Sequence, residues 1–287
     1  MTRNEKAPRN VIFNADCIDV MRSFDRGSVD MIVTDPPYIT RYKSRDGDSV
    51  INDDNSRWLR PAVNQMHRVL KDGGFCVSFY GWNKIDLFFE AWKEAGFRVV
   101  GHIVFRKGYA SSERFLRYEH EQAYLLAKGE PTLPAHPVPD VIDFPYTGNR
   151  LHPTQKPVEA LMPLIKAFTQ PGDLVLDPFC GSGSTLDAAR QLGRDWTGIE
   201  LGNRHYRTAS ERMADRSGDK APTHLMMDGD IEVAQGWLNH THDDRPYIGL
   251  RIDDPGFVAP IYPDLYDRGD GRTFWTARDD WSGCVVS

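Results

Sequence analysis

The stretch Asp35-Pro36-Pro37-Tyr38 directly follows an apolar run, and its residue types could hold a polar ligand in a fixed geometry. The run from Val29 to Val33 is rich in β-branched and apolar residues, which predicts a buried strand. Two consecutive prolines fix φ, cannot donate to a sheet and keep each preceding residue extended. We therefore expect a stiff loop that presents a carboxylate, a free carbonyl and an aromatic ring. Alone, the stretch fits a site and an ordinary proline-rich strand exit equally well.

A second stretch that could carry chemistry is DPFCGSGST, residues 177–185. It follows an expected strand at 174–176, and Gly181 and Gly183 allow a tight turn and a close approach to a ligand before a helix. About twenty residues later another expected strand ends in Glu200, the spacing of a nucleotide-binding β-α-β unit whose acid holds ribose hydroxyls. Glycine also serves purely structural turns. No Lys-Ser/Thr pair follows the glycines, which argues against a phosphate-cradling P-loop.

Apolar periodicity places both stretches in an alternation of strands and helices. We expect strands at 10–16, 29–35, 73–81, 98–107, 174–176 and 194–202, and helices at 17–28, 58–70, 84–95, ending near 169, from about 184, and at 203–216. This alternation predicts an α/β fold with a mainly parallel sheet covered by helices on both faces. Residues 129–148 contain five prolines and no clear period, so we expect an extended connection there.

The composition is that of a globular protein, with 287 residues, 40% of them hydrophobic. No apolar run is long enough to cross a membrane and the first residues lack a signal-peptide core, so we expect a cytoplasmic protein. Four scattered cysteines indicate neither a metal site nor a disulfide framework. Of 35 Lys+Arg and 41 Asp+Glu, 7 and 14 lie from Ala214 onward, which leaves 28 and 27 in residues 1–213. The acidity therefore belongs to the tail.

Taken together, DPPY, LDPFCGSGST and LHPTQKP resemble the motifs of DNA amino-methyltransferases, which use S-adenosylmethionine to methylate the exocyclic nitrogen of adenine or cytosine. DPPY precedes the glycine loop, as in the circularly permuted beta group of that family. The resemblance covers about residues 10–213 and implies a Rossmann-like fold. Enzymes that methylate glutamine carry a similar proline loop, but usually with Asn first and with the cofactor loop upstream.

The resemblance implies that Asp35, Pro36, Pro37 and Tyr38 are catalytic. An aromatic amine is a poor nucleophile because its lone pair is delocalised into the ring. The carboxylate of Asp35 and the carbonyl of Pro36 would each accept one amino hydrogen and direct the lone pair at the methyl group, with no metal needed. Tyr38 would stack on the flipped base, a contact worth about 1–3 kcal/mol.

The resemblance also implies a cofactor site for S-adenosylmethionine, with Glu200 on the ribose and Asp16 beside the adenine. The expected cofactor-binding residues are Asp16, Cys17, Thr154, Lys156, Pro157, Asp177, Phe179, Cys180, Gly181, Ser182, Gly183 and Glu200. Thr154 and Lys156 match a motif beside the cofactor carboxylate. Residues 152–157 also fit a helix start, with Thr154 as its cap and Pro157 in its first turn.

Double-stranded DNA is the partner that the resemblance implies, with a target-recognition region at about 101–150. Basic and aromatic residues mix there, and the family often has a similar His120-Glu121 pair, although a solvated helix face explains the mix almost as well. The polar loop 41–55 could close over a flipped base or be idle. The candidate DNA-binding residues are Arg41, Lys43, Arg45, Arg106, Lys107, Arg114 and Arg117. A homodimer is compatible with the resemblance, since the family often dimerises.

We expect a methyltransferase domain at 1–215 and a small acidic, β-rich extension at 221–287. Three short strands are expected in the extension, YIGLRI, APIYPDLY and RTFWTA, and it resembles the end of a family of short bacterial proteins of unknown function. The acidity of the extension argues against DNA contact.

The predicted function is DNA adenine-N6 methylation, because Asp rather than Ser before Pro-Pro-Tyr favours adenine in this family. Cytosine-N4 methylation is the alternative. A non-catalytic DNA-binding regulator is a further alternative, against which the intact Asp35, Tyr38, Gly181 and Glu200 argue.

Overall fold

The computed structural model describes residues 7–40, 51–111, 115–134, 136–145 and 155–214, and the backbone of five strands between residues 224 and 277. The chain divides into two compact units, Met1–Asp215 and Arg216–Ser287, each with its own sheet. In the described residues, no helix has both the length and the apolar character needed to span a membrane.

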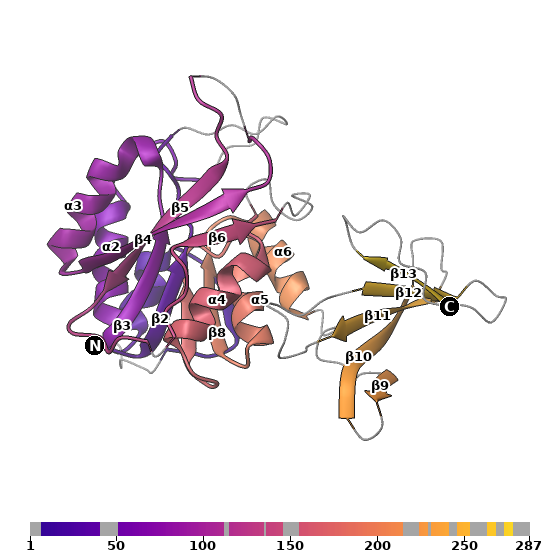
Figure 1. Ribbon diagram of the computed structural model, residues 1–287. Helices are drawn as coiled ribbons and strands as arrows, with labels where there is room; N and C mark the ends of the chain where they lie inside the picture. The colour runs from indigo at the N-terminus through magenta and orange to yellow at the C-terminus, as the bar shows by residue number, and fades with distance from the viewer. Residues whose placement is uncertain are drawn as a thin grey trace. The chain divides into compact units, whose positions relative to one another are not determined.

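The first unit is built on an eight-stranded sheet (Figure 1). Its strands are β1 (Val11–Asn14), β2 (Val29–Thr34), β3 (Leu70–Phe79), β4 (Arg98–Lys107), β5 (His120–Ala127), β6 (Val141–Phe144), β7 (Leu174–Asp177) and β8 (Asp195–Glu200). The helices described with them are α1 (Cys17–Ser23), α2 (Leu59–Val69), α3 (Ile85–Ala95), α4 (Val158–Phe168), α5 (Ser184–Gln191) and α6 (Asn203–Ala214), with a 3₁₀ turn at Trp82–Lys84.

The sheet is mixed and mainly parallel, in the order β1-β8-β7-β2-β3-β5-β4-β6. The first five of these strands are parallel to one another. β5 is antiparallel to both β3 and β4, and β6 is parallel to β4. At the centre, β2 pairs with β7 in the register Met31↔Val175 and Ile32↔Leu176, which joins segments far apart in the chain.

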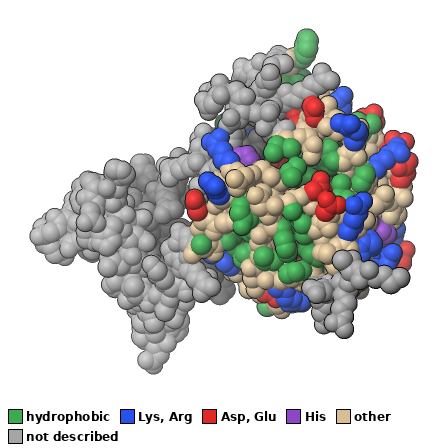
Figure 2. Space-filling view, turned by 180° about the vertical axis from the view of Figure 1, so that it is seen from behind, with side chains coloured by type: hydrophobic (Ala, Val, Ile, Leu, Met, Phe, Trp, Pro, Cys, Tyr) green, Lys and Arg blue, Asp and Glu red, His purple; other side chains and the backbone are tan. Residues whose placement is uncertain are grey.

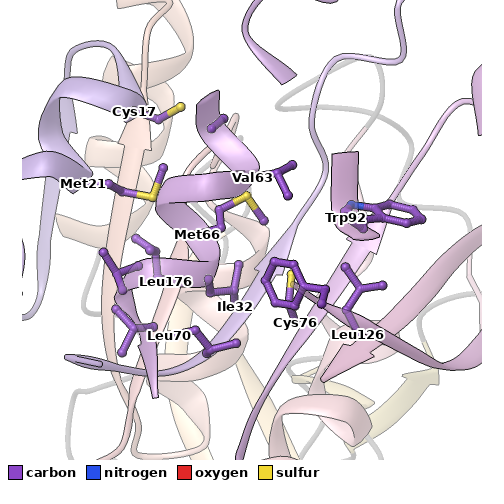
Figure 3. Packing of buried hydrophobic residues seen from close by; sticks show 14 of the residues in the cluster. Cys17, Met21, Ile32, Val63, Met66, Leu70, Cys76, Trp92, Leu126 and Leu176 are labelled. Carbon is purple, nitrogen blue, oxygen red and sulfur yellow. The ribbon is translucent and has the colours of Figure 1, made fainter. Parts of the chain in front are cut away.

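Helices cover both faces of the sheet, as the alternation predicts. Successive residues of a strand face opposite sides, so Ile32 of β2 belongs to the core under α1–α3, whereas Met31 and Val33 belong to the core under α4–α6. Figure 3 shows the first core, where side chains of three helices meet those of the sheet: Met21, Val63, Met66 and Trp92 with Ile32, Leu70, Cys76, Leu126 and Leu176. This α/β, Rossmann-like fold is confirmed.

Two expectations for the first unit, and one alternative interpretation, were wrong. The connection at 129–148 contains the strand β6. Exposed and buried residues alternate in it, with Ile142 and Phe144 buried, but four residues between prolines are too short a pattern to recognise. The described part of the basic and aromatic region is not a helix face: β4 and β5 pair as antiparallel strands through it. Pro157 lies outside the first turn of α4, because it is the N-cap residue of a helix that begins at Val158.

The second unit contains a five-stranded antiparallel sheet rather than three strands. Its strands are β9 (His224–Asp228), β10 (Ile231–His240), β11 (Pro246–Ile252), β12 (Pro263–Asp267) and β13 (Thr273–Ala277), in the order β13-β12-β11-β10-β9. The segments YIGLRI, APIYPDLY and RTFWTA overlap β11, β12 and β13. β9 and β10 were missed because Gln235 and Gly236 interrupt the apolar pattern of the longer strand.

We predict that Gly198→Ala destabilises the first unit by about 1–3 kcal/mol, the usual cost of overpacking. A Cβ at this position of β8 would lie 2.6 Å from Leu186 Cδ1 and 3.0 Å from Cys180 Sγ, so these two buried side chains would have to shift in a packed core. Urea unfolding measures the effect. The control is Gly108→Ala, whose Cβ would meet nothing within 4 Å. Equal stability of the two variants would contradict the packing argument.

Candidate functional site

Four parallel strands end at one edge of the sheet, and each brings an acidic side chain to it. Asp35 follows β2, Asp177 ends β7 and Glu200 ends β8. Asp16 follows β1 and caps α1, where it accepts a hydrogen bond of 2.7 Å from the Ile18 N–H. All four line one cavity of about 630 Å³. Open α/β sheets bind ligands at this edge, and the volume lies within the roughly 300–1,000 Å³ of small-molecule sites.

The cavity brings together most of the predicted site. It is lined by the predicted catalytic residues Asp35, Pro36, Pro37 and Tyr38 and by the predicted cofactor-binding residues Asp16, Cys17, Lys156, Asp177, Phe179, Cys180, Gly181, Ser182 and Glu200. Two others, Pro157 and Gly183, are N-cap residues of α4 and α5 and do not line it. Thr154 lies outside the described residues.

The glycine loop between β7 and α5 is fastened to Glu200. Gly181 and Gly183 have φ angles of 49° and 82°, a region that favours glycine. The Gly181 N–H donates to Glu200 Oε2 at 3.0 Å, and the Gly202 N–H donates to Oε1 at 2.7 Å. Each carboxylate oxygen keeps a further lone pair for a ligand. Glu200 is therefore both a fixed acceptor and the link between two loops of the cavity.

The buried groups in the floor of the cavity have shifted pKa values. Burial raises the pKa of Asp177 to about 7, although hydrogen bonds from the Thr185 hydroxyl and from the Phe179 N–H, the latter 3.1 Å long, oppose the shift. Burial also raises the pKa of the thiols of Cys17 and Cys180. Both are therefore protonated and unreactive at neutral pH, which favours a packing role.

The loop after β2, residues 35–38, is called the proline loop here, and in it Asp35 makes several short hydrogen bonds. The Lys156 ammonium donates to Asp35 Oδ2 at 2.6 Å, and the Tyr38 hydroxyl donates to Oδ1 at 2.7 Å. A Cβ at Gly81 would lie 2.7 Å from the Tyr38 carbonyl oxygen, so glycine is needed where the chain after β3 passes the loop. Ile39 has a φ of 60°, a strained value for a β-branched residue, as is found at functional loops.

Glu121 was not among the predicted site residues, although it lines the same cavity. It stands at the start of β5, and because β5 runs opposite to β2 this start reaches the edge where β2 ends. Glu121 Oε1 accepts from the buried Lys107 ammonium at 2.5 Å. Burial alone would raise the pKa of Glu121, but Lys156 and Lys107 outweigh that effect and lower it. The sequence singles out Glu121 only as part of a pair with His120 in the target-recognition region, because no local pattern reports strand direction and hence its place in the cavity.

Ile51, Asn52, Asp53 and Trp58 form another part of the cavity wall, of which the sequence suggests only the loop 41–55 as a cover for the base. Trp58 packs edge-on against Phe179, with ring centroids 5.1 Å apart. The buried Asp53 accepts from the N–H and the hydroxyl of Thr40, at 3.2 and 3.1 Å. These contacts tie the segment to both the proline loop and the glycine loop.

The predicted DNA-binding residues are partly described. Arg106 ion pairs with Asp143 at 2.7 Å and Arg117 with Glu119 at 2.9 Å, on exposed side chains. Lys107 is buried against Glu121, which is a poor position for a phosphate contact, so we do not retain it as a DNA-binding candidate. Positive and negative side chains are interspersed on the face that Figure 2 shows. The remaining candidates, Arg41, Lys43, Arg45 and Arg114, lie outside the described residues.

A family of known proteins accounts for this arrangement. The model of the family described as DNA methylase (N6_N4_Mtase) matches residues 29–148 and 143–211. The chain belongs to the DNA methylase family. The amino-methyltransferase family inferred from the motifs is thereby confirmed. A second family, described as a protein of unknown function (DUF736), matches residues 199–277, which agrees with the resemblance noted for the tail.

Relatives of this DNA methylase include YubD of Escherichia coli (strain K12), a protein named as a methylase, 53% identical over 199 residues that cover 69% of this chain and 88% of YubD. The Type II methyltransferase M2.MboI of Moraxella bovis is 28% identical over 228 residues, covering 66% of this chain and 82% of that protein.

Solved structures have the same fold. The crystal structure of the M1.HpyAVI–SAM complex is 26% identical, has a TM-score of 0.56, and aligns with 70% of this chain and 98% of that chain. The cytosine-N4-specific PvuII DNA methyltransferase has a TM-score of 0.58 over 79% of this chain and 89% of that chain. At 16% identity it shows the fold alone.

We predict that Asp177→Asn removes part of the pH dependence of stability. The folded protein keeps the Asp177 proton up to about pH 7, whereas an ordinary aspartate loses it near 3.8. The stabilisation is therefore complete below about pH 4 and is lost as the pH rises through 7, by at most ~1.4 kcal/mol per pH unit. Thermal unfolding of both proteins between pH 4 and 8 measures the difference, and parallel pH profiles would contradict the assigned shift.

Proposed function

We propose that this DNA methylase is a site-specific adenine-N6 methyltransferase that uses S-adenosylmethionine. The observation that carries the proposal is the single cavity shared by the proline loop, with Asp35, and the glycine loop, fastened to Glu200. A carboxylate that can accept from an amine thus lies in the same cavity as the loop of a nucleotide-binding unit. Methyl transfer from a nucleoside cofactor to an amine requires both.

The cavity suits the cofactor. Glu200 would accept from the ribose hydroxyls, and Asp16, beside α1, would lie near the cofactor adenine. Trp58 and Phe179 provide an apolar wall, and Gly181 lets the backbone come close. When bound, S-adenosylmethionine supplies an electrophilic methyl group. Cys17, Cys180 and Ser182 line the cavity, and the two thiols stay protonated because burial raises their pKa.

The proline loop suits the amine. Asp35 and the Pro36 carbonyl would each accept one amino hydrogen and turn the nitrogen lone pair toward the methyl group. Pro36 and Pro37 limit the backbone freedom of both acceptors, and preorganised acceptors are where electrostatic catalysis gains most. Tyr38 would stack on the flipped base and offset part of the cost of flipping.

The proposal also specifies which base is methylated. Adenine and cytosine both present an amine beside a ring nitrogen, so the acceptors alone do not choose between them. Asp at position 35 favours adenine, by the family tendency, and cytosine-N4 remains the alternative. We propose double-stranded DNA as the substrate, with Arg106 and Arg117 as the described candidates for phosphate contact, residues 1–215 as the methyltransferase domain and 221–287 as an accessory extension. From the order of its motifs, we infer that the enzyme is of the beta group.

The first experiment incubates the purified full chain with unmethylated plasmid DNA and S-adenosylmethionine, digests the DNA and identifies nucleosides by mass spectrometry. We expect N6-methyldeoxyadenosine from the wild type and none from Asp35→Ala, since the amine loses its acceptor. Formation of N4-methyldeoxycytidine instead would show that cytosine, the alternative base, is the target. Full activity of Asp35→Ala would rule out the mechanism.

We also predict that Glu200→Ala weakens the binding of S-adenosylmethionine about tenfold or more, because hydrogen bonds to a charged acceptor contribute about 1.5–3 kcal/mol. Isothermal titration calorimetry measures the affinity. Glu211→Ala, which removes an exposed glutamate from α6, is the matched control and should bind normally. Unchanged affinity in Glu200→Ala would exclude its ribose role.

A further inference from the structure

Both oxygens of the Asp35 carboxylate are already occupied by the protein's own donors. Oδ2 accepts from the Lys156 ammonium at 2.6 Å, and Oδ1 accepts from the Tyr38 hydroxyl at 2.7 Å. A target amine that binds to Asp35 must share or replace one of these contacts. Tyr38 can keep its hydroxyl on Oδ1 while its ring faces a base, whereas Lys156 fills the Oδ2 side with a nitrogen donor. The lysine thus stands where the amine needs to bind.

Lys156 is charged and enclosed in this position. Its side chain is 8% exposed, and its ammonium lies 4.8 Å from the centroid of the Phe79 ring and 5.7 Å from that of Tyr38. Burial lowers the pKa of Lys156, but Asp35 and Glu121 outweigh this effect and raise it. A full positive charge therefore rests on the acceptor assigned to the amine.

A positive charge at that place opposes the proposed reaction. As the amine attacks, positive charge moves from the cofactor sulfur onto the amine nitrogen, and the Asp35 carboxylate favours this charge. An ammonium bound to the same carboxylate cancels much of the attraction and repels the developing charge, the more so in a low-dielectric cavity. The lysine must therefore leave Asp35 for the carboxylate to act.

Glu121 is the acceptor best suited to receive it. Three carboxylates act on Lys156, namely Asp35, Glu121 and Asp177. Asp177 holds its proton to about pH 7 and already accepts from Thr185 and Phe179, so it attracts a cation weakly. Glu121 is held by Lys107 through Oε1, and among the described residues no donor bonds to its Oε2.

We propose that Lys156 is a positioning residue that pairs with Asp35 in the resting enzyme and moves to Glu121 when the target amine binds. The proposal rests on the amine-binding role of Asp35 given above. In the resting site two lysines and two carboxylates form two ion pairs, Lys156–Asp35 and Lys107–Glu121. After the exchange both lysines share Glu121, and Asp35 is free for the base. The Lys156–Asp35 ion pair thus compensates the charge of Asp35 only until the substrate binds.

The exchange predicts opposite effects for two variants. Lys156→Met removes the competitor, so the KM for DNA falls. Glu121→Gln removes the charged acceptor that draws the lysine away, so the KM for DNA rises about tenfold, as expected for loss of a charge-assisted contact. In the double variant there is no lysine to displace, so Glu121→Gln has no further effect on KM. A merely structural role of either residue would instead raise KM or lower stability in both variants.

The test measures kcat and KM on plasmid DNA for the wild type, both single variants and the double variant. The binding of a fluorescein-labelled duplex fragment of that plasmid, in the presence of S-adenosylhomocysteine, gives the same comparison without turnover. S-Adenosylmethionine affinity by calorimetry should be unchanged in Glu121→Gln. The nucleoside formed by the wild type tests the proposed function. The exchange is tested separately, by whether the effect of Glu121→Gln on KM depends on the presence of Lys156.

Lys128→Met is the matched control, because Lys128 is also a buried lysine. It lies beyond the far end of β5, where it donates to the Leu70 carbonyl at 2.7 Å and pairs with Asp72 at 3.6 Å. We expect lower stability but an unchanged KM for DNA. A tenfold effect of Glu121→Gln that persists in the Lys156→Met background, or a KM that rises in Lys156→Met, would overturn the exchange.

Discussion

The parallel pairing of β2 with β7 is the constraint on which the site depends. It sets Met31 beside Val175 and Ile32 beside Leu176, so Asp35 and Asp177 emerge at the same edge although they belong to distant parts of the chain. The pairing is held by side chains buried on both faces, since Ile32 and Leu176 enter one core and Met31 and Val175 the other. A one-residue slip of β2 would exchange its two faces, so the register of the core also fixes the register of the site.

Charge balance is the second property of the cavity. Removing a carboxylate or an ammonium from water is costly unless it is paired, and one unpaired partner costs more than the pair. Lys156 with Asp35 and Lys107 with Glu121 satisfy this requirement in the resting protein. The same pairing limits function, because an acceptor that is fully satisfied cannot accept from a substrate. A second carboxylate that acts on Lys156 reduces the conflict, since the ammonium keeps a carboxylate partner after it leaves Asp35.

The sequence allowed the fold and the central motifs to be predicted because their signals are local. Buried strands ending in Asp177 and Glu200, and a helix from Ser184 after two glycines, follow from residue patterns within a few positions. Glu121 could not be found in this way, because its place depends on the direction of β5. The partner of Lys156 could not be found either. The family motif placed Lys156 beside the cofactor, whereas in the structure Lys156 ion pairs with Asp35. Contacts of that kind depend on tertiary structure.

The two family matches overlap at residues 199–211. In the structure, this segment belongs to the first compact unit. Ile199 and Glu200 end β8, and α6 supports the glycine loop through Arg212, which donates to the Ser182 carbonyl at 3.3 Å, the Ser184 hydroxyl at 3.1 Å and Asp187 at 3.1 Å. Removing α6 would leave this loop without its bracing and Asp187 without one of its guanidinium partners. The first compact unit therefore includes α6, and the antiparallel sheet that follows lies within the residues matched by the family of unknown function.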